Sequence, residues 1–174
     1  MKKKTAKTPS EDFEINLNRA LRYLSYRARS EKEIVTYLNK RIKIQDLKIK
    51  NGMIEKIRNR LRELRLIDDE GFARMWAENR KTKAWRVVKM ELRQKGISED
   101  TIQNLEFRGQ NDDNQPELKI LNDEEKAKKL AEKRMERYKE LPKNEIYQKM
   151  GRYLALKGFD WDTIKRVIDG IFSK

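Results

Sequence analysis

The sequence of 174 residues predicts an all-α fold, in which three tandem three-helix repeats stack into an elongated, curved body. One observation is composition: Gly and Pro, which interrupt helices, number only 7 and 3, while charged residues make up 41% of the chain. A second is that apolar residues recur three and four positions apart, the period of one helical face. A third is an internal repeat that relates one group of three helices to the next.

The first repeat is predicted over residues 11–67, after a disordered basic tail at residues 1–10. Its first helix is expected to start at Ser10, because a Ser cap followed by acidic residues suits a helix N-terminus. The face predicted for this helix carries Leu17, Leu21, Leu24 and Ala28.

A capping box of Ser30 and Glu33 predicts the start of the second helix, whose buried side carries Ile34 and Leu38. The polar stretch 43–52, which ends in Asn51-Gly52, is typical of a connection. A third helix is predicted after it, with a buried face of Ile54, Ile57, Leu61 and Leu64.

The second repeat is predicted over residues 68–107. Asp68 and Asp69 are expected to cap its first helix, Gly96 to end its second, and Ser98 to cap its third. The predicted buried residues are Phe72, Trp76 and Ala77, then Trp85, Val88 and Leu92, then Ile102 and Leu105.

An acidic linker is predicted at residues 108–121, and the third repeat at residues 122–174. Asn122 is expected to open the first helix of this repeat, Pro142 to separate it from the second, and Asp160 to cap the third. The predicted buried faces carry Ala127, Leu130, Ala131 and Tyr138, then Ile146, Met150 and Leu154, then Ile164, Val167, Ile168 and Ile171.

The internal repeat has an offset of 62 residues. It aligns Leu92, Lys95, Gly96, Asp100, Thr101 and Ile102 with Leu154, Lys157, Gly158, Asp162, Thr163 and Ile164. An Ala and an Arg seven positions apart also recur in all three groups, as Ala20 and Arg27, Ala73 and Arg80, and Ala127 and Arg134. Three short helices alone bury little surface, so the repeats are expected to stack.

The net charge of +14 is unevenly distributed. Residues 11–67 carry 15 basic and 8 acidic groups, and residues 126–174 carry 14 and 7. Between them, residues 68–107 are neutral and residues 108–125 carry 2 basic and 6 acidic groups. Two basic blocks of this kind suit a polyanion or an acidic protein surface as partner.

The sequence contains no Cys and no His, which excludes disulfides, Cys or His metal sites, a His-based triad and a Cys nucleophile. Helix caps explain Asp68-Asp69 better than paired catalytic carboxylates do, and Gly96 and Gly158 better than phosphate loops do. We therefore predict no enzymatic activity, no metal and no cofactor. The absence of a long apolar segment and of a secretory signal predicts a cytoplasmic protein without membrane contact.

Four motifs in this order together resemble the RecX family. They are Leu24-Ser25-x-Arg27-x-Arg29-Ser30-Glu31-x-Glu33-Ile34, Leu66-Ile67-Asp68-Asp69-x-x-Phe72-Ala73, Glu91-Leu92-x-Gln94-Lys95-Gly96-Ile97 and Tyr153-Leu154-x-x-Lys157-Gly158-Phe159. The resemblance covers about residues 16–172. The chain departs from it at 80–85, which lacks the glycines that many members have there.

The resemblance implies three tandem three-helix repeats and a protein that acts without catalysis. RecX-like proteins bind the RecA recombinase filament in its helical groove. They usually inhibit its ATPase, strand-exchange and coprotease activities, and so act in DNA repair, recombination and the SOS response. The expected partners are therefore the RecA filament and single- or double-stranded DNA, and the chain is expected to be a monomer.

Basic side chains that flank the apolar faces are the candidate contacts with filament or DNA. They are Arg27, Arg29, Arg58, Arg62, Arg65, Arg80, Lys81, Arg86, Lys89, Arg93, Lys95, Lys149, Arg152 and Lys157. Arg58, Arg62 and Arg65 are expected to form one basic line on their helix, and the sets in the second and third repeats one continuous stripe. Solvated helix faces explain such runs equally well. The alternative function is a non-catalytic, basic, helical DNA- or RNA-binding protein that contacts only phosphates.

Three tryptophans are candidate base-stacking platforms. Trp76 and Trp85 fall on predicted buried faces and are expected in the core. Trp161 lies beside two aspartates, which places it poorly for stacking on an anionic strand.

Overall fold

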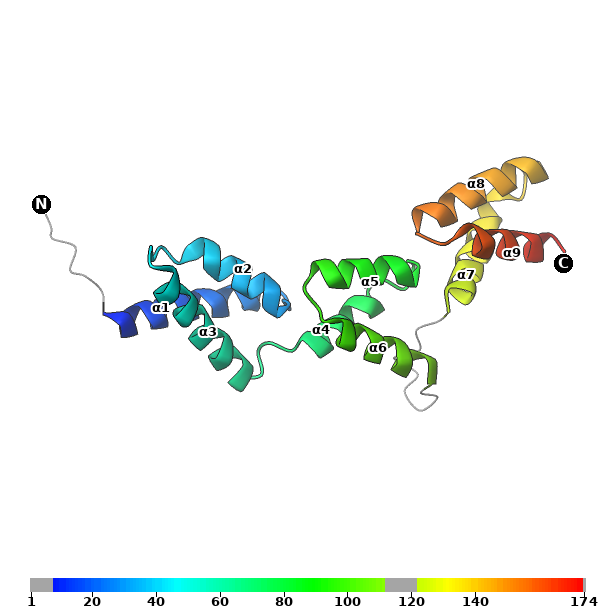
Figure 1. The fold of residues 1–174 in the computed structure, drawn as a ribbon. Coiled ribbons are helices and arrows are strands. Elements are labelled where there is room, and N and C mark those ends of the chain that lie inside the picture. Colours follow the sequence, from blue (N-terminus) through cyan, green and yellow to red (C-terminus); the bar gives the residue numbers. More distant parts are fainter. Residues whose placement is uncertain (1–7, 112–121, 174) are drawn as a thin grey trace, which may run out of the picture. The chain divides into compact units, whose positions relative to one another are not determined.

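The computed structural model describes residues 8–111 and 122–173 of the chain, and within these ranges it contains helices and no strand. In chain order the elements are α1 (Pro9–Ser25), α2 (Glu31–Arg41), α3 (Leu47–Glu63), α4 (Asp69–Glu78), α5 (Trp85–Gln94), α6 (Glu99–Asn111), α7 (Asp123–Met135), the 3-10 helix η2 (Glu136–Tyr138), α8 (Lys143–Leu156) and α9 (Trp161–Phe172) (Figure 1). The all-α prediction is confirmed. None of the described helices is both long and apolar enough to cross a membrane.

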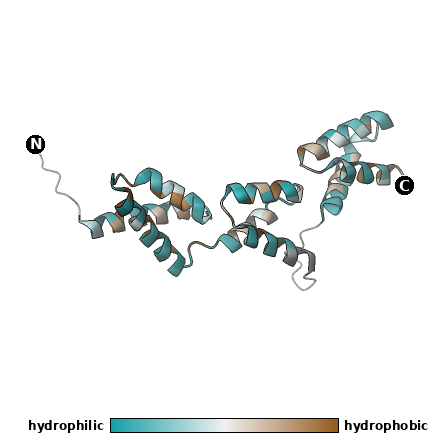
Figure 2. Ribbon diagram, in the orientation of Figure 1, coloured by the Kyte–Doolittle hydropathy of each residue, from teal (hydrophilic) through white to brown (hydrophobic). Residues whose placement is uncertain are grey.

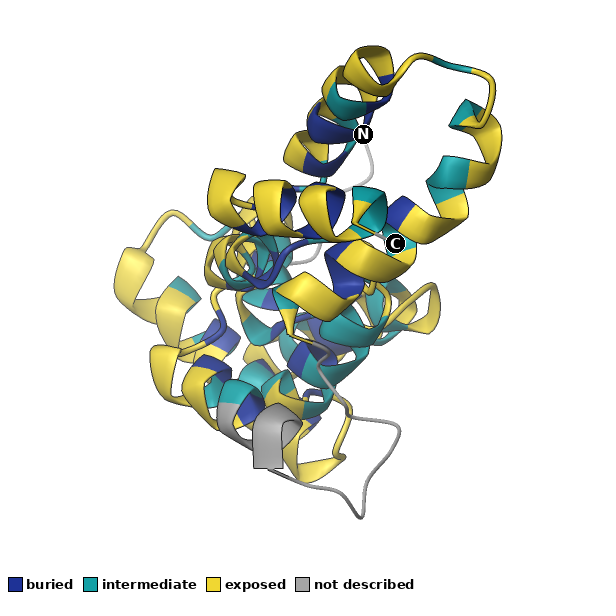
Figure 3. Cartoon of the chain, turned by 90° about the vertical axis from the view of Figure 1, so that its right-hand side faces the viewer, coloured by how far each residue is buried: buried dark blue, intermediate teal, exposed yellow. Residues whose placement is uncertain are grey.

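The chain divides into two compact units. The first comprises Met1–Phe72 with Lys95–Ile97, and the second comprises Ala73–Gln94 with Ser98–Lys174. Each unit has an apolar core of its own. Buried and exposed residues alternate along the helices (Figure 3), and apolar residues are interspersed at that period among hydrophilic ones (Figure 2).

The core of the first unit lies between α1, α2 and α3. It contains Leu17, Ala20, Ile34, Leu38, Ile42, Ile54, Ile57, Leu61 and Ile67. The predicted faces of α2 and α3 are thus confirmed as far as Leu61. Leu64 is not part of this face, since α3 ends at Glu63 and the Leu64 side chain is exposed. Ala28 is also exposed, because α1 has already ended at Ser25.

Helix α1 begins earlier than predicted. The Thr8 hydroxyl accepts a hydrogen bond from the Glu11 amide, and the Glu11 carboxylate accepts one from the Thr8 amide. This capping box satisfies two backbone donors, and Pro9 occupies the first helical position, where its missing N–H costs nothing. Ser10 is therefore inside the helix, and the predicted tail extends two residues too far.

Helix α3 also begins earlier than predicted. Asp46 caps it, since its carboxylate accepts hydrogen bonds from the amides of Lys48 and Ile49 at 2.8 and 3.1 Å. Asn51-Gly52 therefore lies within the helix rather than in a connection. Gly52 is exposed, so its only cost is the weak helix propensity of glycine, about 1 kcal/mol, which the buried face of α3 outweighs.

The core of the second unit lies mainly among α7, α8 and α9. It contains Ala84, Ala127, Ala131, Met150, Leu154, Phe159, Ile164, Val167 and Ile168. Ala84 immediately precedes α5, so the second group of helices contributes to the core of the third. Helix α6 continues to Asn111, and the first four residues of the predicted linker are thus helical. The rest of the linker lies outside the described residues.

Both Lys-Gly loops of the internal repeat contact the N-terminus of a preceding helix. In the first unit, the Ser30 hydroxyl donates to the Lys95 carbonyl at 2.7 Å, and the Glu31 amide donates to Asp69 Oδ1 at 2.8 Å. The bond from Ser30 to Lys95 explains why Lys95–Ile97 groups with the first unit. The loop turns at Gly96, whose φ of 83° is the left-handed conformation that the sequence predicted.

The second unit repeats this contact with equivalent residues. The Ala84 amide donates to the Lys157 carbonyl at 3.0 Å, and the Trp85 amide donates to Asp123 Oδ1 at 2.8 Å. Gly158 has a φ of 90°. The 62-residue offset therefore marks a loop whose lysine carbonyl accepts a hydrogen bond from the residue before a helix, while a nearby aspartate accepts the first helical amide.

Candidate functional site

Two of the candidate cations in the first unit share the carboxylate of Glu33. Arg27 Nη2 and Lys95 Nζ each lie 2.8 Å from Glu33 Oε1. Partial burial of Glu33 would raise its pKa, but the hydrogen bonds from Arg27 and Lys95 outweigh burial and lower the pKa to about 2. The charges of Arg27 and Lys95 are therefore largely compensated within the unit.

Glu31 compensates two further candidates. Arg62 Nη2 lies 2.6 Å from one of its carboxylate oxygens and Arg58 Nη1 lies 3.4 Å from the other. Arg58 also pairs with Glu55. Arg65 has a left-handed backbone with φ of 54° beyond the end of α3, so the predicted basic line does not continue to it along the helix. Among the described residues, Arg65 makes no ion pair, and it is exposed.

Arg29 is held by an aromatic pair instead of a carboxylate. Its guanidinium lies 4.0 Å from the centroid of the Tyr23 ring. That ring stacks on Tyr37 at 4.1 Å with an interplanar angle of 5°, and Arg41 lies 5.6 Å from the Tyr37 centroid on α2. This column of two cations and two rings ties α1 to α2, as cation–π and stacking contacts favour.

In the second unit, Glu91 of α5 collects three hydrogen bonds. Arg80 Nε lies 2.9 Å from its carboxylate, and Trp76 Nε1 donates to it at 2.8 Å. Lys83 also pairs with Glu91. Burial would raise the pKa of Glu91, but the hydrogen bonds from Lys83, Trp76 and Arg80 together outweigh burial and lower the pKa. Lys81 is exposed and has no ion-pair partner in the described part of the chain.

The basic row on α5 also bonds to groups of its own unit. Arg86 Nε donates to the Gly158 carbonyl. Lys89 Nζ lies 3.3 Å from a carboxylate oxygen of Glu106, and Arg93 Nη2 lies 2.6 Å from one of Glu99. Arg86 thus helps to hold the α8–α9 connection, whereas Lys89 and Arg93 join α5 to α6.

On α8, the three candidates differ. Lys149 pairs with Glu145 one turn earlier at 3.1 Å. Lys157 Nζ lies 5.7 Å from the centroid of the Tyr153 ring. Arg152 is exposed and forms no ion pair with a described residue. The continuous stripe over α5 and α8 stays a prediction. Its members without a carboxylate partner among the described residues are Lys81, Arg86, Arg152 and Lys157.

The groups considered for catalysis have structural roles. Asp68 Oδ1 accepts a hydrogen bond from the Gly71 amide at 3.0 Å, which confirms it as a helix cap. Asp69 accepts the Glu31 amide, and its burial, with the charges of Glu31 and Asp68, raises its pKa. In the ranges that the structure describes, no three Asp or Glu side chains are grouped so that they could hold a metal ion.

Of the tryptophans, Trp85 is buried and Trp76 is partly buried, as predicted. Trp161 is the exposed member, with 61% of its surface accessible, and its ring passes over Gly151 of α8.

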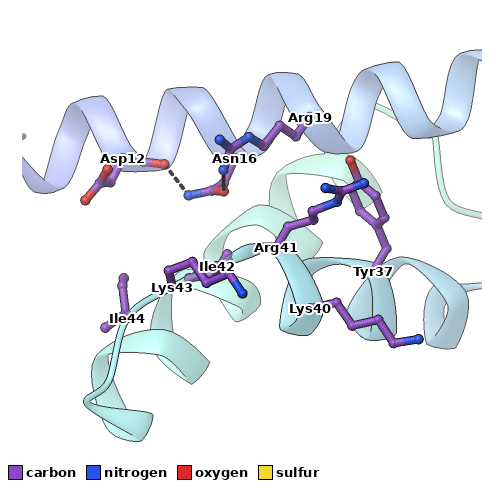
Figure 4. A pocket seen from close by; sticks show the side chains of 9 residues that line it. All are labelled: Asp12, Asn16, Arg19, Tyr37, Lys40, Arg41, Ile42, Lys43 and Ile44. Carbon is purple, nitrogen blue, oxygen red and sulfur yellow. Dashed lines mark hydrogen bonds between the residues drawn. The ribbon is translucent and has the colours of Figure 1, made fainter.

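Sequence reasoning missed one basic cleft in the first unit (Figure 4). It has a volume of about 680 Å³ and lies between α1, the last turn of α2 and the connection to α3. Its lining residues are Asp12, Asn16, Arg19, Tyr37, Lys40, Arg41, Ile42, Lys43 and Ile44. The run Lys40-Arg41-x-Lys43 was visible in the sequence, but only the packing of α1 against α2 adds Arg19 to it.

Comparison with known protein families matches three consecutive models to this chain. They are described as the first, second and third three-helix domains of RecX, and they match residues 17–42, 68–104 and 122–168. The matched ranges follow one another in the order of their numbering.

Individual relatives agree with these models. "Regulatory protein RecX" of Enterococcus faecalis is 34% identical over 166 residues, which are 93% of this chain and 56% of that protein. "Regulatory protein RecX" of Clostridioides difficile is 31% identical over 159 residues, 90% of this chain and 68% of that protein. The chain thus spans little more than half the length of the first of these relatives. The crystal structure of RecX from Lactobacillus salivarius superposes with a TM-score of 0.68 at 27% identity, covering 95% of this chain and 99% of that one.

Proposed function

The chain belongs to the RecX family, and we propose on this premise that it is a cytoplasmic regulator of the RecA recombinase. It binds the RecA–DNA filament as a monomer, in the helical groove, and inhibits the ATPase, strand-exchange and coprotease activities of RecA. The observation that carries this proposal is the ordered match of all three RecX three-helix domains.

The chemistry of the described surface supports binding rather than catalysis. The chain has no Cys or His, and the acidic side chains Asp68 and Asp69 are engaged in backbone hydrogen bonds. Its net charge of +14 favours a partner that exposes phosphates and carboxylates, which a protein-coated nucleic acid does.

The candidate cations contribute to this binding in two ways. Arg65, Lys81 and Arg152 are exposed and have no carboxylate partner among the described residues, so their charges are available to a partner. Arg27, Arg58, Arg62, Arg80, Lys89, Arg93, Lys95 and Lys149 are held by carboxylates. Each of these cations keeps a fixed position, but the carboxylate offsets its charge. It therefore contributes less to the electrostatic attraction of an anionic partner.

The test is a titration of the cognate RecA ATPase on single-stranded DNA at two salt concentrations. Inhibition that is half-maximal well below one molecule per RecA protomer supports a regulator that blocks filament growth. A requirement for enough protein to cover the DNA would support a simple nucleic-acid binder instead. No effect at any ratio would refute the proposal.

A charge-reversal pair identifies the contacting cations. Lys81→Glu with Arg152→Glu removes two uncompensated charges of the second unit and should raise the concentration needed for inhibition. Lys128→Glu with Lys129→Glu changes the net charge equally on the exposed side of α7 and serves as the matched control. Equal effects of the two pairs would show that net charge alone matters.

A further inference from the structure

We propose that the basic cleft of the first unit binds the sugar–phosphate backbone of a single-stranded nucleic acid. Figure 4 shows that its cationic side chains come from two directions, Arg19 from α1 and Lys40, Arg41 and Lys43 from the end of α2 and the following connection. Asp12 is the one carboxylate of the lining.

The charge of this cleft is not compensated. In the part of the chain that the structure describes, none of its four cations makes an ion pair. Most of the other basic residues considered above do pair with a carboxylate, as Arg62 does with Glu31 and Arg93 with Glu99. Like charges gathered without counter-charges repel one another, and an anionic ligand relieves that repulsion.

The two guanidinium groups are already positioned. Arg19 Nη1 donates to Asn16 Oδ1 at 3.0 Å, and Asn16 Nδ2 in turn donates to the Asp12 carbonyl at 2.7 Å. Arg41 lies over the Tyr37 ring. Planar guanidinium groups present paired donors that match phosphate oxygens, and fixing them beforehand lowers the entropy lost on binding.

The remaining lining favours a phosphate backbone over an acidic peptide. Its apolar members offer no anchors, because Ile42 is buried in the core and Ile44 packs against that core. Peptides that dock as an added strand or an amphipathic helix rely on such anchors. One face of the Tyr37 ring is stacked on Tyr23 and Arg41 lies over the ring, so it offers no platform for a base.

The size of the cleft favours a single strand. A volume of about 680 Å³ lies in the range of small-ligand pockets, roughly 300–1,000 Å³, which matches a few nucleotides of one strand. The predicted contact is consequently sequence-independent and strongly dependent on salt.

The test uses the full chain and a fluorescent oligothymidylate, with affinity measured by anisotropy from 0.05 to 0.5 M salt and without RecA. Lys40→Ala with Lys43→Ala removes two contacts from exposed positions and should not disturb folding. At about 0.7 released counterions per phosphate contact on a single strand, the magnitude of the negative slope of log K against log salt should decrease by about 1.4. Over the tenfold change from 1 M to 0.1 M salt, a slope difference of about 1.4 corresponds to binding about 25-fold weaker at 0.1 M.

The matched control is Arg22→Ala with Lys48→Ala, which removes two exposed cations of the same unit outside the cleft. This pair should change the slope much less. Equal losses in the two pairs, or unchanged binding in the cleft variant, would overturn the proposal. If the cleft variant loses inhibition of RecA but keeps oligonucleotide binding, the cleft contacts protein and the proposal is wrong, although the proposed regulation stands.

A second readout locates the contact directly. Acetylation of lysines in the wild-type chain, followed by mass spectrometry, should show Lys40 and Lys43 protected several-fold by saturating oligothymidylate, while Lys48 stays reactive. Equal reactivity of Lys40 and Lys43 with and without oligonucleotide would refute the site even if the chain binds DNA elsewhere.

Discussion

Replacing Gly158 by Ala should destabilise the second unit more than any other Gly→Ala change in its described helices and loops. Gly158 has a φ of 90°, and a side chain in a left-handed conformation costs about 1–2 kcal/mol. Its new Cβ would also collide with a methyl group of Val87 in the first turn of α5. Overpacking of this kind costs about 1–3 kcal/mol, so the expected total loss is about 2–5 kcal/mol.

A second substitution separates the two causes. Val87→Ala removes the methyl group that the new Cβ would meet, so the double variant should recover the overpacking part of the loss and retain the conformational part. Gly96→Ala has a similar φ, 83°, but its Cβ would meet the side chain of Lys32, which can move aside. Its loss should therefore stay near the conformational part alone. Gly170→Ala is the control, because this helical glycine has no atom near the added methyl and the change should be neutral or stabilising by up to about 1 kcal/mol.

The assay is urea denaturation followed by tryptophan fluorescence, since Trp85 and Trp161 flank the α8–α9 connection. For a chain of this size, 1 kcal/mol corresponds to about 2–4 °C in melting temperature, so a thermal scan should show a shift of about 4–20 °C. A loss below 1 kcal/mol for Gly158→Ala, or no recovery in the double variant, would refute the reasoning.

Three further changes test individual contacts. Glu33→Gln should cost about 1–3 kcal/mol at neutral pH, because its partners lower the pKa of Glu33 to about 2 while solvent screens the partly exposed pairs. This difference from wild type should shrink as pH falls from 4.5 towards 2 in urea titrations. Asp69→Asn keeps an acceptor for the Glu31 amide and removes the carboxylate, whose pKa is raised by burial. The variant should match or exceed wild-type stability at pH 7, and any gain should vanish below pH 3.8, where the carboxyl group is protonated in both the folded and the unfolded chain. A large loss of stability at pH 7 would contradict this expectation. Trp161→Ala should lower the free energy of unfolding by less than about 1 kcal/mol while removing the solvent-exposed component of the emission.

Capping residues in the sequence predicted most helix starts, and the two wrong starts, those of α1 and α3, also have causes in the neighbouring residues. Ser30, Asp68, Ser98, Asn122 and Asp160 all cap helices as expected, because capping involves residues only two or three positions apart. At the start of α1, Thr8 and Ser10 are both residue types that cap helices, and the reciprocal hydrogen bond to the Glu11 carboxylate selects Thr8. At α3, Asn51-Gly52 resembled a turn, but the Asp46 cap starts the helix before it and the burial of Ile54 and Ile57 stabilises the helix beyond it.

The candidate site could be predicted only as a set of charged residues. Arg62 and Glu31 are 31 positions apart, and Lys95 and Glu33 are 62 apart, so no helical spacing reveals that these pairs form. Each pair offsets the charge that the cation would otherwise present to a partner. The cleft that joins Arg19 to Lys43 likewise depends on the packing of α1 against the end of α2.

The helical class, most of the buried faces, most of the caps and the repeated Lys-Gly loops follow from the sequence alone, because each depends on contacts within one turn or one period. The family followed from the order of its motifs. Which cations are neutralised, which are exposed and which converge depends on the fold, because charges interact through space and the packing of the helices sets those distances. Net charge indicated an anionic partner, and the fold shows that Arg65, Lys81, Arg152 and the four cations that line the cleft have no carboxylate partner among the described residues.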